Sequence, residues 1–182
     1  VVAWPFDRFY NYGSEFAAEL NPDNIIYEHK LDGTCCIVYW DSILNEWCVG
    51  TRNVPDGDLA NSDGKTFAEM FWDVAEPITF FNDNEIVIKV ASLDYEMRLI
   101  PGHTYVFELC GPDNQIVIPY DEWSITLLAQ RNNTSGVLTN GSARHHAFGS
   151  IEECIQWLSE RPGNEIEGFV ANDGVNRVKI KN

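Results

Sequence analysis

The sequence is short of basic residues and has no long apolar run. Its 182 residues include 12 lysines and arginines against 28 aspartates and glutamates, which gives a formal net charge of −16. This balance argues against a broad basic surface of the kind that most nucleic-acid binders carry. No apolar run approaches the roughly 20 residues that cross a bilayer as a helix, so we expect no membrane contact.

Cysteine lacks the spacing of a metal site or a disulfide framework. The chain has five cysteines, an odd number, and no pair has CxxC spacing. We therefore expect buried thiols in a reducing compartment.

The composition is that of a folded domain, with 45% hydrophobic and 13% aromatic residues. Short runs rich in β-branched and aromatic residues predict strands at 25–27, 35–40, 46–53, 104–109, 115–118, 125–129, 166–171 and 177–181. Helices are expected at 66–75 and at 151–160, the second opened by a capping box of Ser150 and Glu153. Residues 82–100 fit either a helix or a strand, and 53–65 read as a polar loop.

Consecutive strands are expected to pair as hairpins. The pairs are 34–40 with 46–53, 104–109 with 115–118, and 166–171 with 177–181. Hairpins with a few separate helices predict an α+β fold built on antiparallel sheets.

The stretch 28–34 places Lys30 in a polar turn between two predicted strands. Asp32 and Gly33 close the turn, because glycine adopts positive φ without a Cβ clash. Such a turn presents one amine beside a backbone that can approach a phosphate. The pattern Lys-x-Asp-Gly also fits an ordinary hairpin turn with a solvated lysine, so it needs support from the rest of the chain.

The last predicted strand provides cations. Arg177, Lys179 and Lys181 alternate with Val178 and Ile180, so the cations share one face and the aliphatic side chains the other. A solvated edge strand protected by lysines has the same pattern.

Two acids, Glu108 and Glu167, lie in apolar strand segments and are followed closely by a glycine. An inward carboxylate there needs a cation, a metal or a hydrogen-bonding ligand, whereas an outward one needs nothing. A lysine nucleophile, two carboxylates and a pair of cations together are the groups that phosphoryl chemistry on a nucleotide requires.

The order of these motifs resembles the covalent nucleotidyltransferases, which are the polynucleotide ligases and mRNA capping enzymes. The motifs are Lys30-Leu31-Asp32-Gly33, Gly50-Thr51-Arg52, Phe107-Glu108-Leu109 with Gly111-Pro112 and Asn114, Glu167-Gly168-Phe169-Val170, and Lys179-Ile180-Lys181. Within them the chain is most similar to ATP-dependent RNA ligases of the bacteriophage T4 RNA ligase 1 type. That group also has a basic–aromatic–aromatic–Asn stretch, matched here by Arg8-Phe9-Tyr10-Asn11.

The resemblance implies a three-step reaction with ATP and Mg²⁺ or Mn²⁺ as cofactors. Lys30 forms a lysyl-AMP, AMP passes to an RNA 5′-phosphate, and a 3′-hydroxyl displaces it. Lys179 and Lys181 hold the α-phosphate, and Glu167 and Glu108 serve the metal, Glu108 also contacting the ribose. The nucleotide is further contacted by the family's matching positions, which are Glu28 at the adenine amino group, His29, Gly33, Arg52, Arg8 and Tyr10.

The resemblance also implies a nucleotidyltransferase (ATP-grasp-like) domain of antiparallel sheets flanked by helices, with the nucleotide cleft between the sheets. Residues 1–182 are expected to form a single adenylyltransferase domain, a fragment without an N-terminal segment and a C-terminal RNA-specificity domain. The expected partners are RNA ends and ATP, with no obligate protein partner. The expected location is the cytoplasm, that of the host if a phage encodes the chain.

Two other interpretations stay open from the sequence. One is a DNA ligase or a GTP-dependent capping-type nucleotidyltransferase on the same fold, because residue types do not decide the base or the sugar. The other is a non-catalytic nucleotide- or RNA-binding module. The −16 charge favours this module, whereas the set of Lys30, Glu167, Lys179 and Lys181 argues against it, because binding alone does not require a nucleophile.

Overall fold

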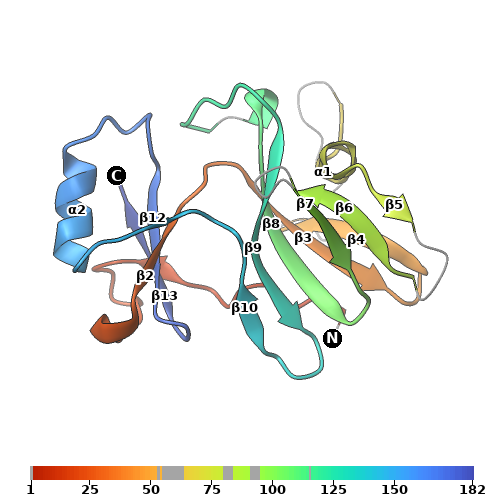
Figure 1. The fold of residues 1–182 in the computed structure, drawn as a ribbon, viewed down its shortest axis with the longest axis horizontal. Helices are drawn as coiled ribbons and strands as arrows, with labels where there is room; N and C mark the ends of the chain where they lie inside the picture. The colour runs from red at the N-terminus through yellow and green to blue at the C-terminus, as the bar shows by residue number, and fades with distance from the viewer. Residues whose placement is uncertain (1, 53, 55–63, 80–83, 91–94, 115) are drawn as a thin grey trace. The chain divides into compact units, whose positions relative to one another are not determined.

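The computed structural model describes residues 1–182 except 1, 53, 55–63, 80–83, 91–94 and 115. The chain divides into two compact units (Figure 1). The first unit comprises Val1–Phe6, Gly33–Gln115 and Tyr120–Ser142, and the second comprises Asp7–Asp32, Ile116–Pro119 and Ala143–Asn182.

The first unit contains a five-stranded antiparallel sheet with strand order β10-β9-β8-β3-β4. Its strands are β3 (Thr34–Asp41), β4 (Glu46–Thr51), β8 (His103–Cys110), β9 (Ser124–Asn132) and β10 (Leu138–Asn140). A second sheet, of order β5-β6-β7, is formed by β5 (Ile78–Thr79), β6 (Ile86–Val90) and β7 (Tyr95–Leu99). The region 82–100, which fitted either a helix or a strand, therefore forms β6 and β7 within the described residues.

Helix α1 (Phe67–Ala75) completes the core of the first unit. It begins at a reciprocal capping box, in which Thr66 accepts from the backbone N–H of Glu69 and Glu69 accepts from that of Thr66. Its apolar face packs against β4, β6 and β9. Phe71 of the helix lies 5.3 Å from Phe107 of β8, ring centre to ring centre, in the buried core.

The second unit is built on a sheet of order β1-β13-β12-β2-β11. Its strands are β1 (Tyr10–Asn11), β2 (Ile26–His29), β11 (His145–His146), β12 (Gly168–Asn172) and β13 (Arg177–Lys181). β1 runs parallel to β13, and the other pairs are antiparallel.

The two faces of this sheet differ in chemistry. Helix α2 (Ile151–Ser159) covers one face, and Cys154 and Leu158 of the helix join a buried cluster with Tyr27, Phe169, Ala171, Val178 and Ile180. Because side chains alternate along a strand, the residues between these apolar positions lie on the other face. That face carries Arg177 and Lys179, as the alternation in the sequence predicts.

Most of the predicted elements are confirmed, among them both helices and the hairpins β3–β4 and β12–β13. The hairpin of 104–109 with 115–118 is wrong, because β8 pairs with β9 instead. Pro112–Asn114 forms a 3-10 turn, and the backbone N–H groups of Val117 and Ile118 bind the Asp32 carboxylate rather than a strand. At α2, Ser150 caps the helix as predicted, but Glu153 accepts from Gly149 rather than from Ser150. The predicted loop 53–65 lies mostly outside the described residues.

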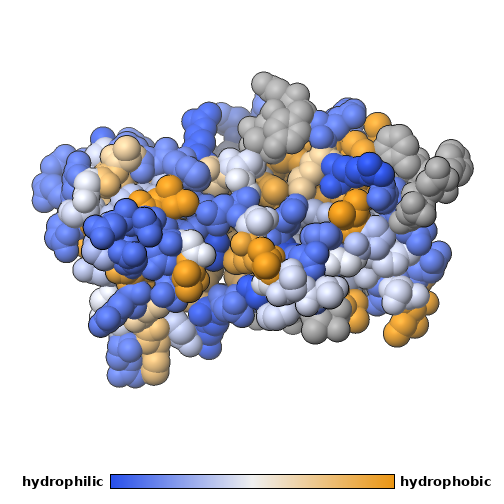
Figure 2. All heavy atoms as spheres, turned by 60° about the horizontal axis from the view of Figure 1, so that its bottom comes forward, coloured by the Kyte–Doolittle hydropathy of each residue, from blue (hydrophilic) through white to orange (hydrophobic). Residues whose placement is uncertain are grey.

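Neither helix in the described part of the chain is long and apolar enough to cross a membrane, since α1 and α2 have nine residues each. On the face drawn in Figure 2, hydrophobic residues form separate patches among hydrophilic ones. The five cysteines are free thiols, and Cys36, Cys110 and Cys154 are buried.

Candidate functional site

Lys30 directly follows β2 and is held there by the neighbouring strand. Its backbone N–H donates to the carbonyl oxygen of Gly168 at 2.9 Å, which continues the pairing of β2 with β12. Gly168 has a φ of 145°, and a Cβ added to it would lie 2.1 Å from the carbonyl oxygen of Ile180. Position 168 therefore requires glycine, because β13 approaches its backbone too closely for a Cβ.

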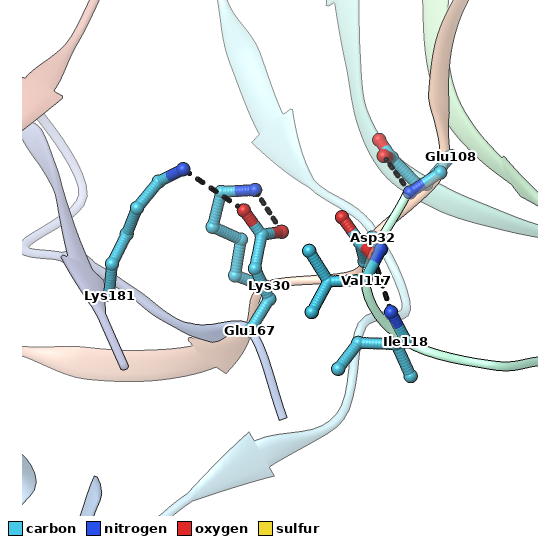
Figure 3. Close-up of polar contacts among 8 residues, drawn as sticks. Lys30, Asp32, Glu108, Val117, Ile118, Glu167 and Lys181 are labelled. Carbon is cyan, nitrogen blue, oxygen red and sulfur yellow. Dashed lines mark hydrogen bonds and ion pairs between the residues drawn. The ribbon is translucent and has the colours of Figure 1, made fainter. Parts of the chain in front are cut away.

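The side chains of Lys30 and Lys181 converge on Glu167 (Figure 3). The Lys30 amine donates to Glu167 Oε2, and the Lys181 amine lies 3.1 Å from Oε1. Glu167 stands one residue before β12, rather than inside a strand as the sequence predicted. Its carboxylate has two cations beside it, which is one of the environments expected for an inward acid. Two ammonium groups around one carboxylate leave an excess positive charge that suits an anionic ligand.

Glu28 lies two residues before Lys30, and strand alternation places both side chains on the polar face of the sheet. Glu28 is buried, at 7% exposure. Oε2 accepts from Asn172 Nδ2 at 3.4 Å, while Oε1 is buried and has no hydrogen-bond partner among the described residues. Burial raises the pKa of Glu28 above its ordinary value of 4.5, and Asn172, Arg177 and His145 oppose that rise.

The segment that matches the basic–aromatic–aromatic–Asn stretch lies along β13. Asn11 of β1 is paired with Lys179, and the Lys179 amine lies 4.8 Å from the centre of the Phe9 ring. The Arg8 guanidinium lies over the Tyr10 ring, 4.9 Å from the ring centre, in a cation–π contact. Tyr10 is paired with Val178, whose side chain lies on the apolar face, so strand alternation places Tyr10 on the opposite face of the sheet from Lys179.

His29, a predicted nucleotide contact, lies on the other face of β2 from Glu28 and Lys30. Its ring centre is 4.9 Å from that of Phe169, its paired residue on β12. Burial, followed by the nearby His146 and Arg144, lowers the pKa of His29 below 6.5. This placement gives His29 a packing role against the α2 side of the sheet.

Asp32 is almost fully buried and acts as a backbone anchor (Figure 3). Its Oδ2 accepts from the N–H groups of Val117 at 2.5 Å and Ile118 at 2.7 Å. The carboxylate that follows the lysine in the Lys-x-Asp-Gly motif therefore holds the segment Ile116–Pro119.

Gly33, Arg52 and Glu108 belong to the first unit. Gly33 donates its backbone N–H to Glu108 Oε1 at 3.0 Å, and a Cβ at Gly33 would lie 2.2 Å from the carbonyl oxygen of Leu109. Glu108 is 9% exposed, so its carboxylate lies inward, which is one of the two alternatives that the sequence leaves open. Arg52 follows the end of β4 and is exposed.

Sequence reasoning missed Asn172, His145 and the partners of Asp32. Asn172 lies one residue beyond the predicted strand 166–171, although β12 continues through it. His145 lies directly opposite Glu28 in the pairing of β11 with β2. The alternation of β12 is the signal that could have found Asn172, because it places Asn172 and Val170 on one face.

A metal role for Glu167 or Glu108 would rest on few protein ligands. Among the described residues no three His, Cys, Asp or Glu side chains form a group that could hold a metal ion. Mg²⁺ commonly uses one or two carboxylates and completes its shell with phosphate oxygens and water. A single carboxylate at each place therefore fits Mg²⁺ when a nucleotide supplies the other oxygens.

Comparison with curated proteins gives two relatives. The chain is 24% identical over 196 residues to a protein named "RNA ligase" from Rhodothermus phage RM378, covering 90% of this chain and 39% of the relative. The chain is similar to RNA ligases. A second relative, "Putative RNA ligase" of Thermovibrio ammonificans, is 27% identical over 187 residues, covering 95% of this chain and 43% of the relative.

This similarity indicates a relationship to RNA ligases without selecting one type among them. The chain spans about two-fifths of the length of these curated relatives, at 39% and 43%. No family model matches the chain.

Proposed function

We propose that this chain is the adenylyltransferase part of an ATP-dependent RNA ligase of the bacteriophage T4 RNA ligase 1 type. The observation that carries the proposal is the convergence of Lys30 and Lys181 on Glu167 at the polar face of one sheet. The similarity to proteins named as RNA ligases supports it independently. The proposal includes the nucleotidyltransferase fold, with a nucleotide cleft between the sheets, that the resemblance implies.

In the first step the Lys30 amine is the nucleophile. Its Nζ gives up a proton and forms a bond to the α-phosphorus of ATP, and the bond from that phosphorus to the pyrophosphate oxygen breaks. Pyrophosphate leaves with the electron pair. Glu167 is in contact with the amine, so its carboxylate can orient Nζ and receive the proton.

The cations of β13 neutralise charge at the reacting phosphate. Lys181 is half exposed and already beside Glu167, and Lys179 lies on the same strand face two residues earlier. Negative charge grows on the phosphate oxygens as the transition state forms, so ammonium groups at this place lower the barrier. The proposal also includes contacts with the nucleotide from Arg8, Tyr10 and Arg52.

Glu167 and Glu108 are the residues proposed to hold Mg²⁺ or Mn²⁺, which supplies charge neutralisation at the phosphates when bound. Glu108 is also assigned to the ribose and Glu28 to the adenine amino group. AMP then moves to an RNA 5′-phosphate, and a 3′-hydroxyl attacks that phosphate and releases AMP.

The test is covalent labelling. The chain is incubated with α-labelled ATP or GTP and Mg²⁺, and the label is followed through a denaturing gel. We expect label from ATP in the wild type and in Lys65→Ala, an exposed lysine paired with Asp73, and none in Lys30→Ala.

Each other outcome selects a different function. Label from GTP alone indicates a capping-type nucleotidyltransferase. Label from ATP that passes to DNA but not to RNA ends indicates a DNA ligase. No label from either nucleotide contradicts the proposal and favours a non-catalytic binding module.

A further inference from the structure

The Glu28 carboxylate is asymmetric. Oε2 accepts from the amide of Asn172, whereas Oε1 is buried and has no hydrogen-bond partner in the part of the chain that the structure describes. The side chain is 10% exposed, so water contributes little to it. A buried acceptor of this kind favours a ligand that brings a donor to it.

Asn172 occupies one of the two carboxylate oxygens and leaves the other over. It is fully buried, and its Oδ1 accepts from the N–H of Gly174 at 2.8 Å. That bond sets the orientation of the amide, because an amide whose oxygen faces Gly174 must direct its N–H groups the other way. The donor that results points at Glu28 Oε2.

The free oxygen lies within reach of a nucleotide on Lys30. Glu28 and Lys30 are two residues apart on the polar face, about 7 Å along a strand. His145 Nε2 lies 3.8 Å from Oε1, which is beyond hydrogen-bond distance, and its side chain is half exposed. An adenine base that reaches Oε1 therefore has to displace the half-exposed ring of His145 or lie beside it. It does not have to displace any buried side chain of the core.

We propose that Asn172 is a positioning residue for base selection, which turns Glu28 so that Oε1 accepts from the exocyclic amino group of adenine. This inference rests on the proposed function, because it assumes that a nucleotide is bound at Lys30. Asn172 does not touch the base. It acts by binding one carboxylate oxygen and fixing the plane of the group, which leaves the other oxygen for the base.

A merely structural role for Asn172 makes a different prediction. A structural residue affects all nucleotides equally, whereas a positioning residue affects only those that carry the amino group. Purine riboside 5′-triphosphate lacks this group and is otherwise close to ATP in shape. The ratio of its KM to that of ATP, measured for covalent labelling of Lys30, isolates the contact.

We expect the wild type to prefer ATP in KM by at least about tenfold, since loss of a hydrogen bond to a buried charged group has an effect of this order. In Asn172→Ala that preference falls to within about threefold, while kcat and the KM of the analogue change little. Asn172→Asp keeps the acceptor for Gly174 and removes the donor, and it should lose the preference too. The dissociation constants of AMP and purine riboside 5′-monophosphate, measured by calorimetry without metal, should show the same loss of preference for the nucleotide with the amino group.

The matched control is Asn176→Ala, in the same turn. Asn176 donates its side-chain amide to the carbonyl of Glu19 and has no bond to Glu28, so this variant should keep the preference for ATP. An unchanged preference in both Asn172 variants overturns the inference and leaves the ligase proposal standing. Absence of any label in the wild type overturns both.

Discussion

The amine of Lys30 donates to the carboxylate of Glu167, although 137 residues separate them in the chain. The pairing of β2 with β12 brings them together, and the bond from the Lys30 N–H to the Gly168 carbonyl fixes its register. Lys181 reaches the same carboxylate from β13. One acid thus places two lysines on the polar face of a sheet.

Glu167→Ala is expected to abolish covalent labelling while the protein stays folded. Without the carboxylate, the two amines repel each other and lose the acceptor that orients them. Circular dichroism and thermal unfolding report the fold, and the gel assay reports the label. Glu165→Ala is the control, because Glu165 is exposed two residues earlier and should label normally. Full labelling in Glu167→Ala would remove Glu167 from the mechanism.

Gly33→Ala should destabilise the protein by about 2 kcal/mol or more, because a Cβ cannot fit against rigid backbone. The added atom would lie 2.2 Å from the Leu109 carbonyl oxygen, so β8 or the start of β3 has to move. Gly163→Ala meets nothing within 4 Å and should change the free energy of unfolding by less than about 1 kcal/mol. Urea denaturation of both variants measures their free energies of unfolding. Equal losses would show that the close contact of Gly33 with Leu109 does not determine the cost of an added Cβ.

Asp32→Ala should release the segment Ile116–Pro119. The carboxylate accepts two backbone N–H groups, and charged hydrogen bonds contribute about 1.5–3 kcal/mol each. We expect amide hydrogen exchange at Val117 and Ile118 to accelerate strongly, with little change in the β12–β13 pairing. Asp113→Ala, in the neighbouring exposed turn, should leave both amides protected. Unchanged protection in Asp32→Ala would mean that other contacts hold the segment.

Glu28→Gln should stabilise the fold at neutral pH while weakening the use of ATP. Burial raises the pKa of Glu28 above 4.5, so the folded state holds this proton more tightly than the unfolded state does. The stability that it contributes is present below about pH 4.5 and is lost as the pH rises through the folded pKa. The variant lacks this loss, so its advantage in free energy of unfolding should grow from pH 4 towards pH 7. A constant difference across that range would contradict the assignment.

Local features of this chain were predictable from its sequence. The alternation of Lys179 and Lys181 with Val178 and Ile180 is a period-two pattern, and the structure confirms its two faces. The strands on both sides of Lys30 and the helix caps at Thr66 and Ser150 likewise depend on neighbouring residues. The need for a partner at Glu167 followed from the cost of burying a charge.

Long-range pairing was not predictable in the same way. The segment 115–118 has the composition of a strand, but β8 pairs with β9, which is further along the chain. The Asp32 carboxylate takes the amides of Val117 and Ile118, 85 and 86 residues away, and no local pattern encodes that choice. The position of His29 against Phe169 was not predictable either, because its place in the motif does not show on which face of the sheet its side chain lies.

Mapping the attached AMP tests the central claim most directly. The chain is incubated with ATP and Mg²⁺, digested, and the peptides are sequenced by tandem mass spectrometry under conditions that preserve phosphoramidates. The account predicts one AMP on the peptide that contains Lys30, attached to that lysine, with none on Lys179 or Lys181. AMP on another lysine, or no modified peptide at all, would contradict it.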